Sequence, residues 1–213
     1  FMGDEPEDTL LMQKCKYIAE NSMLLLEHIA TAIAPEGSWF EGMGYYEFVM
    51  QHMGWFLETL DNTLSNAFGF LSVKGLADLP DYAMYNQTVN GVFNRAGMTR
   101  HTNNNNYFSP EAFIYAKLSS NTQKTELYNS FRKDMSISTF LPQYILFYDT
   151  SLADEENVAL PLDKYYSSNG VGVMRDIWEK ETGAYVGISG GIGGHYDKGS
   201  FIFDALGERW SVD

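Results

Sequence analysis

The chain has 213 residues, of which 45% are hydrophobic and 15% aromatic, so it can build a folded core and is not a disordered acidic tail. Its 14 basic and 28 acidic residues give a net charge of −14, which disfavours a nucleic acid as partner because phosphate binding requires clustered lysine and arginine. No apolar run reaches the roughly 20 residues of a membrane span. The start shows no signal-peptide pattern, and the sequence leaves the compartment open.

Helical patterns fill the first two thirds of the chain. Apolar residues recur at helical spacing over 8–34, and Pro35-Glu36-Gly37 predicts the end of that helix. A second helix is predicted over 44–67 with two adjacent apolar stripes, so we expect much of its circumference to be covered. One stripe runs through Tyr45, Val49, Phe56 and Leu60, and the other runs through Tyr46, Met50, Met53 and Leu57. Cys15 lies on the stripe of the first helix, so we expect it in the core.

The helical pattern breaks over 73–109, and the four asparagines at 103–106 predict an exposed loop. Ser109-Pro110-Glu111 is a helix-start signal, with a cap, a proline in the first turn and an acid at the positive end of the helix dipole. Further helices are predicted over 110–119, 122–134 and 138–148.

After Pro161 the period becomes that of β-strands. Short alternating runs between glycine clusters predict antiparallel strands through Val171, Val173, Tyr185, Val186, Ile188, Phe201, Phe203, Trp210 and Val212. The shift in composition predicts a helical part over 1–155 and a strand part over 156–213. That strand part is too short to bury a sandwich face and ends in strand-like sequence, so we expect this chain to be a fragment.

Two groups of residues could carry chemistry. His195 and Asp197 would share one face of a strand, which suits a zinc ligand and its hydrogen-bond partner; an ordinary surface pair is the alternative. Tyr45 and Tyr46 follow Glu41 at the start of the second predicted helix.

A tyrosine beside a carboxylate and an aromatic wall, here including Trp39, suits sugar handling and proton transfer. The alternative is that both tyrosines are core residues whose hydroxyl groups reach a backbone partner. His101, next to Arg100 in the predicted polar loop, is a further candidate for substrate contact.

Three segments together resemble the heparinase II/III-like family of polysaccharide lyases. PEGSWFEGMGYYEFVM at 35–50 resembles the family's "DG…EG.GY" segment, and YFSPEAFIYAKL at 107–118 resembles its "SPE.FWLA" helix. The run from VGVMRDIW to GERWSVD at 171–213 is similar to the family's "RSsW…H.HlDaGsF…GeRW" run and is the most specific of the three.

This resemblance implies an α+β multidomain fold, in which part of an (α/α) toroid is followed by the start of an antiparallel β-sandwich and the active cleft lies between them. It implies β-elimination at a uronic acid of an acidic polysaccharide. The C5 proton is abstracted, the uronate carboxylate is neutralised and the C4 oxygen leaves.

The same resemblance places the catalytic tyrosine at Tyr46 or Tyr45. Neighbouring helix positions differ by about 100° in direction, so only one of the two can point into the cleft. Glu41 and Trp39 would line that cleft. His195 and Asp213 map to the family's metal-binding strand residues, which implies a structural zinc.

One position departs from the family pattern. The family has H-x-H-x-D, with the first histidine assigned to catalysis, and Gly193 stands at that place here. This departure favours a second hypothesis, a glycan-binding member that is non-catalytic or has altered chemistry. A structural α/α scaffold for protein interaction is the third.

Overall fold

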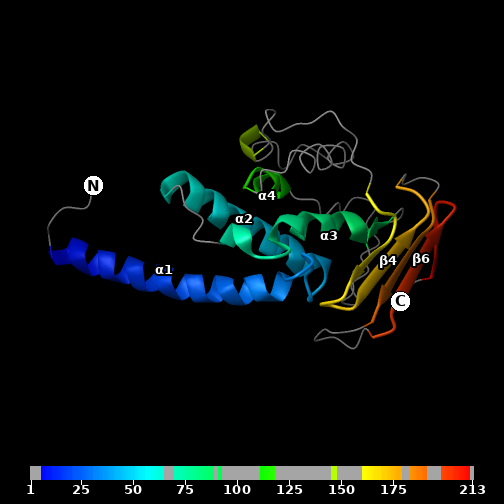
Figure 1. Cartoon of the computed structure of the whole chain (residues 1–213), viewed down its shortest axis with the longest axis horizontal. Coiled ribbons are helices and arrows are strands. Elements are labelled where there is room, and N and C mark those ends of the chain that lie inside the picture. The colour runs from blue at the N-terminus through cyan, green and yellow to red at the C-terminus, as the bar shows by residue number, and fades with distance from the viewer. Residues whose placement is uncertain are drawn as a thin grey trace.

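A computed structural model describes residues 6–64, 70–88, 91–92, 111–118, 145–147, 160–178, 183–190 and 198–211. Within these ranges the fold is a mixture of helices and antiparallel sheet, the coarse class that the sequence predicts (Figure 1). The helices are α1 (Pro6–Ile33), α2 (Met43–Leu64), η1 (Phe70–Ser72), η2 (Leu76–Asp78), α3 (Leu79–Asn86) and α4 (Ala112–Leu118), with a further helical turn at 145–147. None of the helices in the described ranges is long and apolar enough to cross a membrane.

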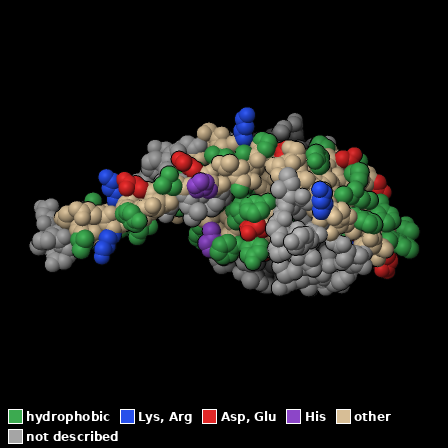
Figure 2. All heavy atoms as spheres, turned by 90° about the horizontal axis from the view of Figure 1, so that it is seen from below, with side chains coloured by type: hydrophobic (Ala, Val, Ile, Leu, Met, Phe, Trp, Pro, Cys, Tyr) green, Lys and Arg blue, Asp and Glu red, His purple; other side chains and the backbone are tan. Residues whose placement is uncertain are grey.

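α1 forms where the sequence predicts a helix, and among its described side chains those buried in the core, Ala30 and Ile33, lie at its C-terminal end. Its N-terminal half extends beyond the body of the molecule (Figures 1 and 2). The prediction that Cys15 is a core residue is wrong, because that half is not covered and the side chain is exposed. Ile18, on the same stripe, is 62% exposed.

One of the two predicted stripes of α2 is its buried face; on the other, Tyr45 is exposed and Val49, Phe56 and Leu60 are only partly buried. Tyr46, Met50, Met53 and Leu57 recur at helical spacing and all lie in the core. α2 packs against α4 at Gly54, where an added Cβ would lie 3.1 Å from the Cβ of Glu111. The helices over 44–67 and 110–119 are thus confirmed in their described parts, as α2 and α4.

α3 falls inside the stretch where the sequence shows a broken pattern, and sequence reasoning missed it. All of its residues except Asp81 are buried, so it has no solvent-facing polar stripe that would reveal a helical period. Pro80 stands in its first turn, where a missing backbone N–H costs nothing. α3 leads into the short hairpin of β1 (Gln87–Thr88) and β2 (Gly91–Val92).

Five strands form one antiparallel sheet in chain order: β3 (Lys164–Tyr166), β4 (Val171–Arg175), β5 (Tyr185–Ser189), β6 (Phe201–Ala205) and β7 (Glu208–Ser211). This confirms the predicted antiparallel strands, except that Val212 lies outside the described residues. One face of the sheet is buried, through Tyr166, Val171, Val173, Tyr185 and Ile202.

The other face of the sheet is exposed and largely apolar. The strand register aligns Tyr165, Gly172, Ile188 and Phe201 in one row across four strands. Met174, Val186 and Phe203 form the next row, and several of these side chains are more than a third exposed. Figure 2 shows hydrophobic side chains gathered at this end of the molecule.

A buried ion pair joins the sheet to the β1 hairpin. Arg209 on β7 donates from Nε to Oδ1 of Asp204 on β6 at 2.7 Å, and Asp204 is fully buried. The same guanidinium donates from Nη2 to Oγ1 of Thr88 at 2.9 Å. Because a buried charge needs a partner, this arginine holds β6, β7 and β1 in one arrangement.

Gly37 and Gly75 bring the end of α1 against the start of η2. Their φ angles are 73° and 83°, a region that L side chains rarely adopt. A Cβ on Gly37 would lie 2.5 Å from the carbonyl oxygen of Gly75, and one on Gly75 would lie 2.9 Å from the carbonyl oxygen of Ile33. Neither position has room for a side chain.

We expect Gly37→Ala to lower the free energy of unfolding by about 2–4 kcal/mol. Steric overlap of about 1–3 kcal/mol adds to the cost of about 1 kcal/mol for a left-handed alanine. Gly199→Ala is the matched control, because its φ is 91° and no atom of the described residues lies within 4 Å of the added Cβ, so it should lose only about 1 kcal/mol. Urea unfolding measures both. Equal losses would contradict the close approach at Gly37.

Candidate functional site

The loop between α1 and α2 carries the residues singled out for sugar chemistry. α1 is closed at its C-terminus by the amide of Gly37, which donates to the carbonyl of Ile33 at 2.9 Å. The amide of Tyr46 donates to the carbonyl of Gly42 at 3.0 Å, which starts the helical bonding of α2. Residues 38–41 are therefore anchored between two helix ends.

Tyr46 is a core residue in the described structure. Its side chain is 0% exposed, and its hydroxyl donates to the carbonyl of Leu79 in α3 at 2.7 Å. Burial, followed by the charges of neighbouring groups including Asp81, raises the pKa of Tyr46 well above 10. A phenol in this position cannot readily give up its proton, and it matches the alternative of a core tyrosine with a backbone partner.

Tyr45 lies on the surface at the same end of α2, with 54% of its side chain exposed. Phe40 and Glu41 are also exposed on the preceding loop. Trp39 is 6% exposed and its ring centre is 5.1 Å from that of Phe40, so it supports the loop from beneath. Of the residues expected to line a cleft, the structure therefore leaves Tyr45 and Glu41 accessible and buries Tyr46 and Trp39.

The sheet contacts this loop through the β3–β4 turn. The side-chain amide of Asn169 donates to the carbonyl of Trp39 at 3.2 Å and to the hydroxyl of Tyr82 at 3.3 Å. The hydroxyl groups of Ser38 and Ser168 are 2.8 Å apart. The loop that precedes Tyr45 thus lies where the helical part meets the antiparallel sheet.

The other candidates from the sequence lie outside the described residues. These are Arg100, His101, His195, Asp213 and the departing position Gly193. The zinc site at His195 and Asp213 accordingly stays a prediction. Among the residues that the structure does describe, no three His, Cys, Asp or Glu side chains gather as they would around a metal ion.

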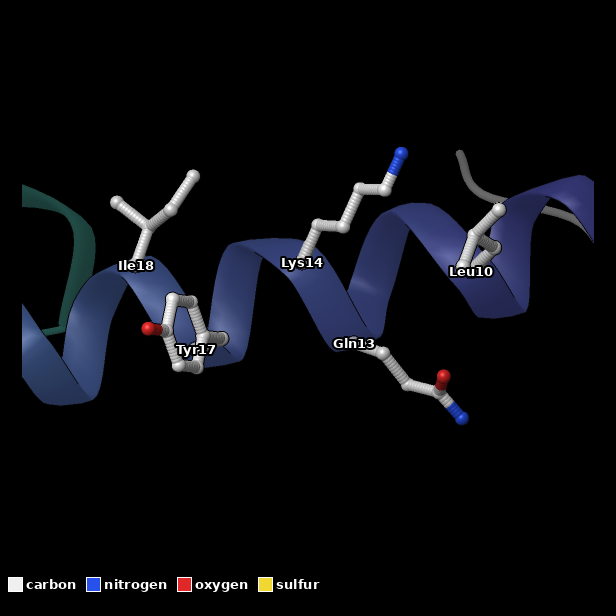
Figure 3. Close-up of a pocket in the computed structure, with 5 residues that line it drawn as sticks. All are labelled: Leu10, Gln13, Lys14, Tyr17 and Ile18. Atoms are coloured by element: carbon white, nitrogen blue, oxygen red, sulfur yellow. The ribbon is translucent and has the colours of Figure 1, made fainter.

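A surface hollow on α1 gives no support to a ligand site. Its lining residues, Leu10, Gln13, Lys14, Tyr17 and Ile18, all belong to this one helix. In Figure 3 the Lys14 and Gln13 side chains point to opposite sides of the helix, so polar groups do not converge there. A binding pocket normally brings several polar groups toward one point.

Sequence reasoning missed a second polar cluster, at the contact between α2 and α4. Glu111 is 3% exposed and accepts a hydrogen bond of 2.8 Å from Nε1 of Trp55. Burial raises the pKa of Glu111 more than the hydrogen bonds and the charge of His52 lower it. Burial also raises the pKa of Glu47 on α2, with a further contribution from the charge of Glu111.

The helix-start signal at Ser109-Pro110-Glu111 finds the position of Glu111 but not its burial. Its partner Trp55 is 56 positions away along the chain, so no local pattern connects them. On the same interface Lys117 pairs with Glu58 at 2.8 Å. Three carboxyl groups therefore lie at the contact between these helices. Glu58 is paired with Lys117, whereas the charged forms of Glu111 and Glu47 are disfavoured by burial.

A scan against models of known protein families finds no match, and a comparison with curated proteins finds none either.

We expect Glu111→Gln to weaken the pH dependence of stability. Because the pKa values of Glu111 and Glu47 are raised in the folded state, the folded state binds more protons than the unfolded state between about pH 4.3 and the folded-state pKa values. The free energy of unfolding therefore falls as pH rises through this range. The glutamine keeps an acceptor for Trp55 but has no proton to lose. Unfolding midpoints between pH 4 and 7 measure this, with Glu27→Gln on the exposed part of α1 as control. An unchanged slope in Glu111→Gln would contradict the assignment.

Proposed function

We propose that this chain is part of a carbohydrate-active protein that cleaves uronate-containing acidic glycans by β-elimination. The observation that carries the proposal is the exposed phenol of Tyr45 at the start of α2, beside the loop that bears Glu41. This loop also contacts the antiparallel sheet, as a cleft between a helical part and a sheet part requires. The resemblance of the three sequence segments to heparinase II/III-like lyases supplies the reaction class.

The proposed reaction assigns one step to Tyr45. Its phenolate form takes the C5 proton of the uronate and becomes the neutral phenol, the C5–H electron pair becomes the C4–C5 double bond, and the C4–oxygen bond breaks. Proton return to the leaving oxygen completes the elimination. Glu41 contacts sugar hydroxyl groups, and Arg100 and His101 are our candidates for pairing with the uronate carboxylate, which needs a local positive site in an acidic chain.

Two features support the finer architecture that we propose, an (α/α) toroid followed by a β-sandwich. α1 and α2 are successive long helices joined by a short loop, with exposed apolar side chains such as Ile18 and Phe48. The open face of the five-stranded sheet is apolar and would be covered by a second sheet in a sandwich. Exposed faces of this kind are expected in a piece of a larger fold.

We also propose a structural zinc held by His195 and Asp213. An imidazole nitrogen and a carboxylate oxygen are suitable zinc ligands, and a structural site normally has four. We give this metal a structural role and assign it no step in the reaction. Its proposed role is to hold strands together near the cleft.

The alternative, a glycan-binding member without this elimination, is favoured by Gly193. A glycine there cannot transfer protons, so any acid or base of the first histidine would have to come from elsewhere. Zinc content and product formation, measured on the same preparation, separate the cases. Bound zinc without product on any uronate polysaccharide would support the alternative.

The neighbouring tyrosines provide the sharpest test of the lyase proposal. Tyr45→Phe should reduce formation of the unsaturated uronate product by at least about 100-fold, because proton transfer contributes that much or more. Its stability should stay unchanged, since the side chain is half exposed. Tyr46→Phe should instead lose about 1 kcal/mol of stability with its buried hydrogen bond to Leu79, while folded molecules keep their activity.

Ultraviolet absorbance of the product on a panel of uronate polysaccharides, combined with urea unfolding, measures both variants. Activity retained by Tyr45→Phe would move the base to another residue. Loss of activity in Tyr46→Phe at unchanged stability would contradict the assignment of Tyr46 to the core.

A further inference from the structure

A single carboxylate joins the loop of the candidate site to the sheet. Glu36, in the turn that follows α1, accepts hydrogen bonds from the hydroxyl of Ser167 and, at 2.9 Å, from the hydroxyl of Ser168. The backbone amide of Ser168 also donates to Glu36 Oε2, at 3.2 Å. Both serines belong to the β3–β4 turn. The two carboxylate oxygens of Glu36 therefore both accept hydrogen bonds from this turn of the sheet.

The contact lies next to the residues that the site uses. Glu36 stands five positions before Glu41. Between them, the hydroxyl of Ser38 bonds to that of Ser168, and the carbonyl of Trp39 accepts a hydrogen bond from Asn169, so both contact the same turn. The turn itself is closed by the amide of Gly170, which donates to the carbonyl of Tyr166 at 2.8 Å. The turn and the loop are each held by hydrogen bonds of their own. The carboxylate of Glu36 is the charged group that connects the two.

We propose that Glu36 is a positioning residue, which fastens the loop carrying Glu41 and leading to Tyr45 onto the β3–β4 turn, so that the sheet sets the place of the candidate site. The role as positioning residue of a site rests on the proposed function. The fastening of loop to turn does not, because it concerns contacts within this chain alone.

The protonation state of Glu36 decides whether this connection forms. Burial alone would raise the pKa of Glu36, but the hydrogen bonds from Ser167 and Ser168 outweigh it and lower the pKa. No charged side chain in the described ranges contributes to this shift. A lowered pKa means that the stabilisation is present above about pH 4.3 and is lost as pH falls through the folded-state pKa.

Hydrogen exchange of the whole chain tests the fastening without any substrate. Glu36→Ala should raise the exchange of amides in 37–43 and 166–170 by about tenfold or more at neutral pH, because it removes hydrogen bonds to a charged acceptor. Exchange in the middle of α2 should stay unchanged. Glu36→Gln keeps one carbonyl acceptor, so its exchange rates in these two segments should lie between those of the parent chain and those of Glu36→Ala. Below the pKa of Glu36 the difference between Glu36→Ala and the parent chain should shrink to about that between Glu36→Ala and Glu36→Gln, because the protonated carboxyl also keeps one carbonyl acceptor.

Glu27→Ala on α1 is the matched control, since it removes an exposed glutamate away from the loop. A second test combines Glu36→Ala with the double substitution Ser167→Ala and Ser168→Ala. The losses in free energy of unfolding should be non-additive, because both changes remove the same hydrogen bonds. Unchanged exchange in both segments, an equal rise throughout the chain, or simple additivity would overturn the proposal.

Activity then separates this inference from the proposed function. Where the parent chain forms product, Glu36→Ala should lower kcat by about tenfold, and Glu36→Gln should restore part of it. An unchanged kcat with a loosened loop would overturn the positioning role. A loosened loop in a chain that forms no product on any glycan would instead disprove the elimination and leave the fastening of loop to turn intact.

Discussion

The carbonyl groups at the end of α3 are the constraint on which the rest of the described structure depends. The last carbonyls of a helix have no partner within it, and here the sheet supplies the donors. Arg175 on β4 donates to the carbonyl of Tyr85 at 2.7 Å and to that of Gln87 at 3.3 Å, and the hydroxyl of Tyr185 also reaches Tyr85 at 3.1 Å. The guanidinium lies 3.8 Å from the ring centre of Trp178, which adds a cation–π contact. These contacts fix the buried face of the sheet against the helical part.

The candidate site follows from that junction. With α3 held on the sheet, Leu79 at its other end accepts the hydroxyl of Tyr46, which turns this side of α2 inward. Tyr45, one position earlier, must then point about 100° away and lies on the surface. The β3–β4 turn meets the preceding loop through Glu36 and Asn169. The structure thus combines an accessible phenol with a preceding loop that the sheet holds in place, and the proposed proton transfer uses this arrangement.

The two groups of unusual carboxylates have opposite effects on the molecule. Glu36 is stabilised in its charged form by hydroxyl and amide donors, so it favours the folded state at neutral pH. Glu111 and Glu47 share a buried contact between helices and favour the neutral form. Acidification therefore loosens the connection between loop and sheet while it relieves the contact between α2 and α4. The chain combines both in a molecule with a net charge of −14.

The sequence by itself determined the elements with a clear period: the long helix α1, the helix α2 and the antiparallel strands after Pro161. Local spacing is enough for these, because side-chain direction repeats with the backbone. It could not show α3, whose burial on nearly all sides removes the amphipathic pattern, or the exposure of Cys15, which depends on what packs beside α1. It also left Tyr45 and Tyr46 as equal candidates. Only the tertiary structure decided which of the two side chains is buried, because the hydroxyl of Tyr46 donates to the carbonyl of Leu79, 33 positions away.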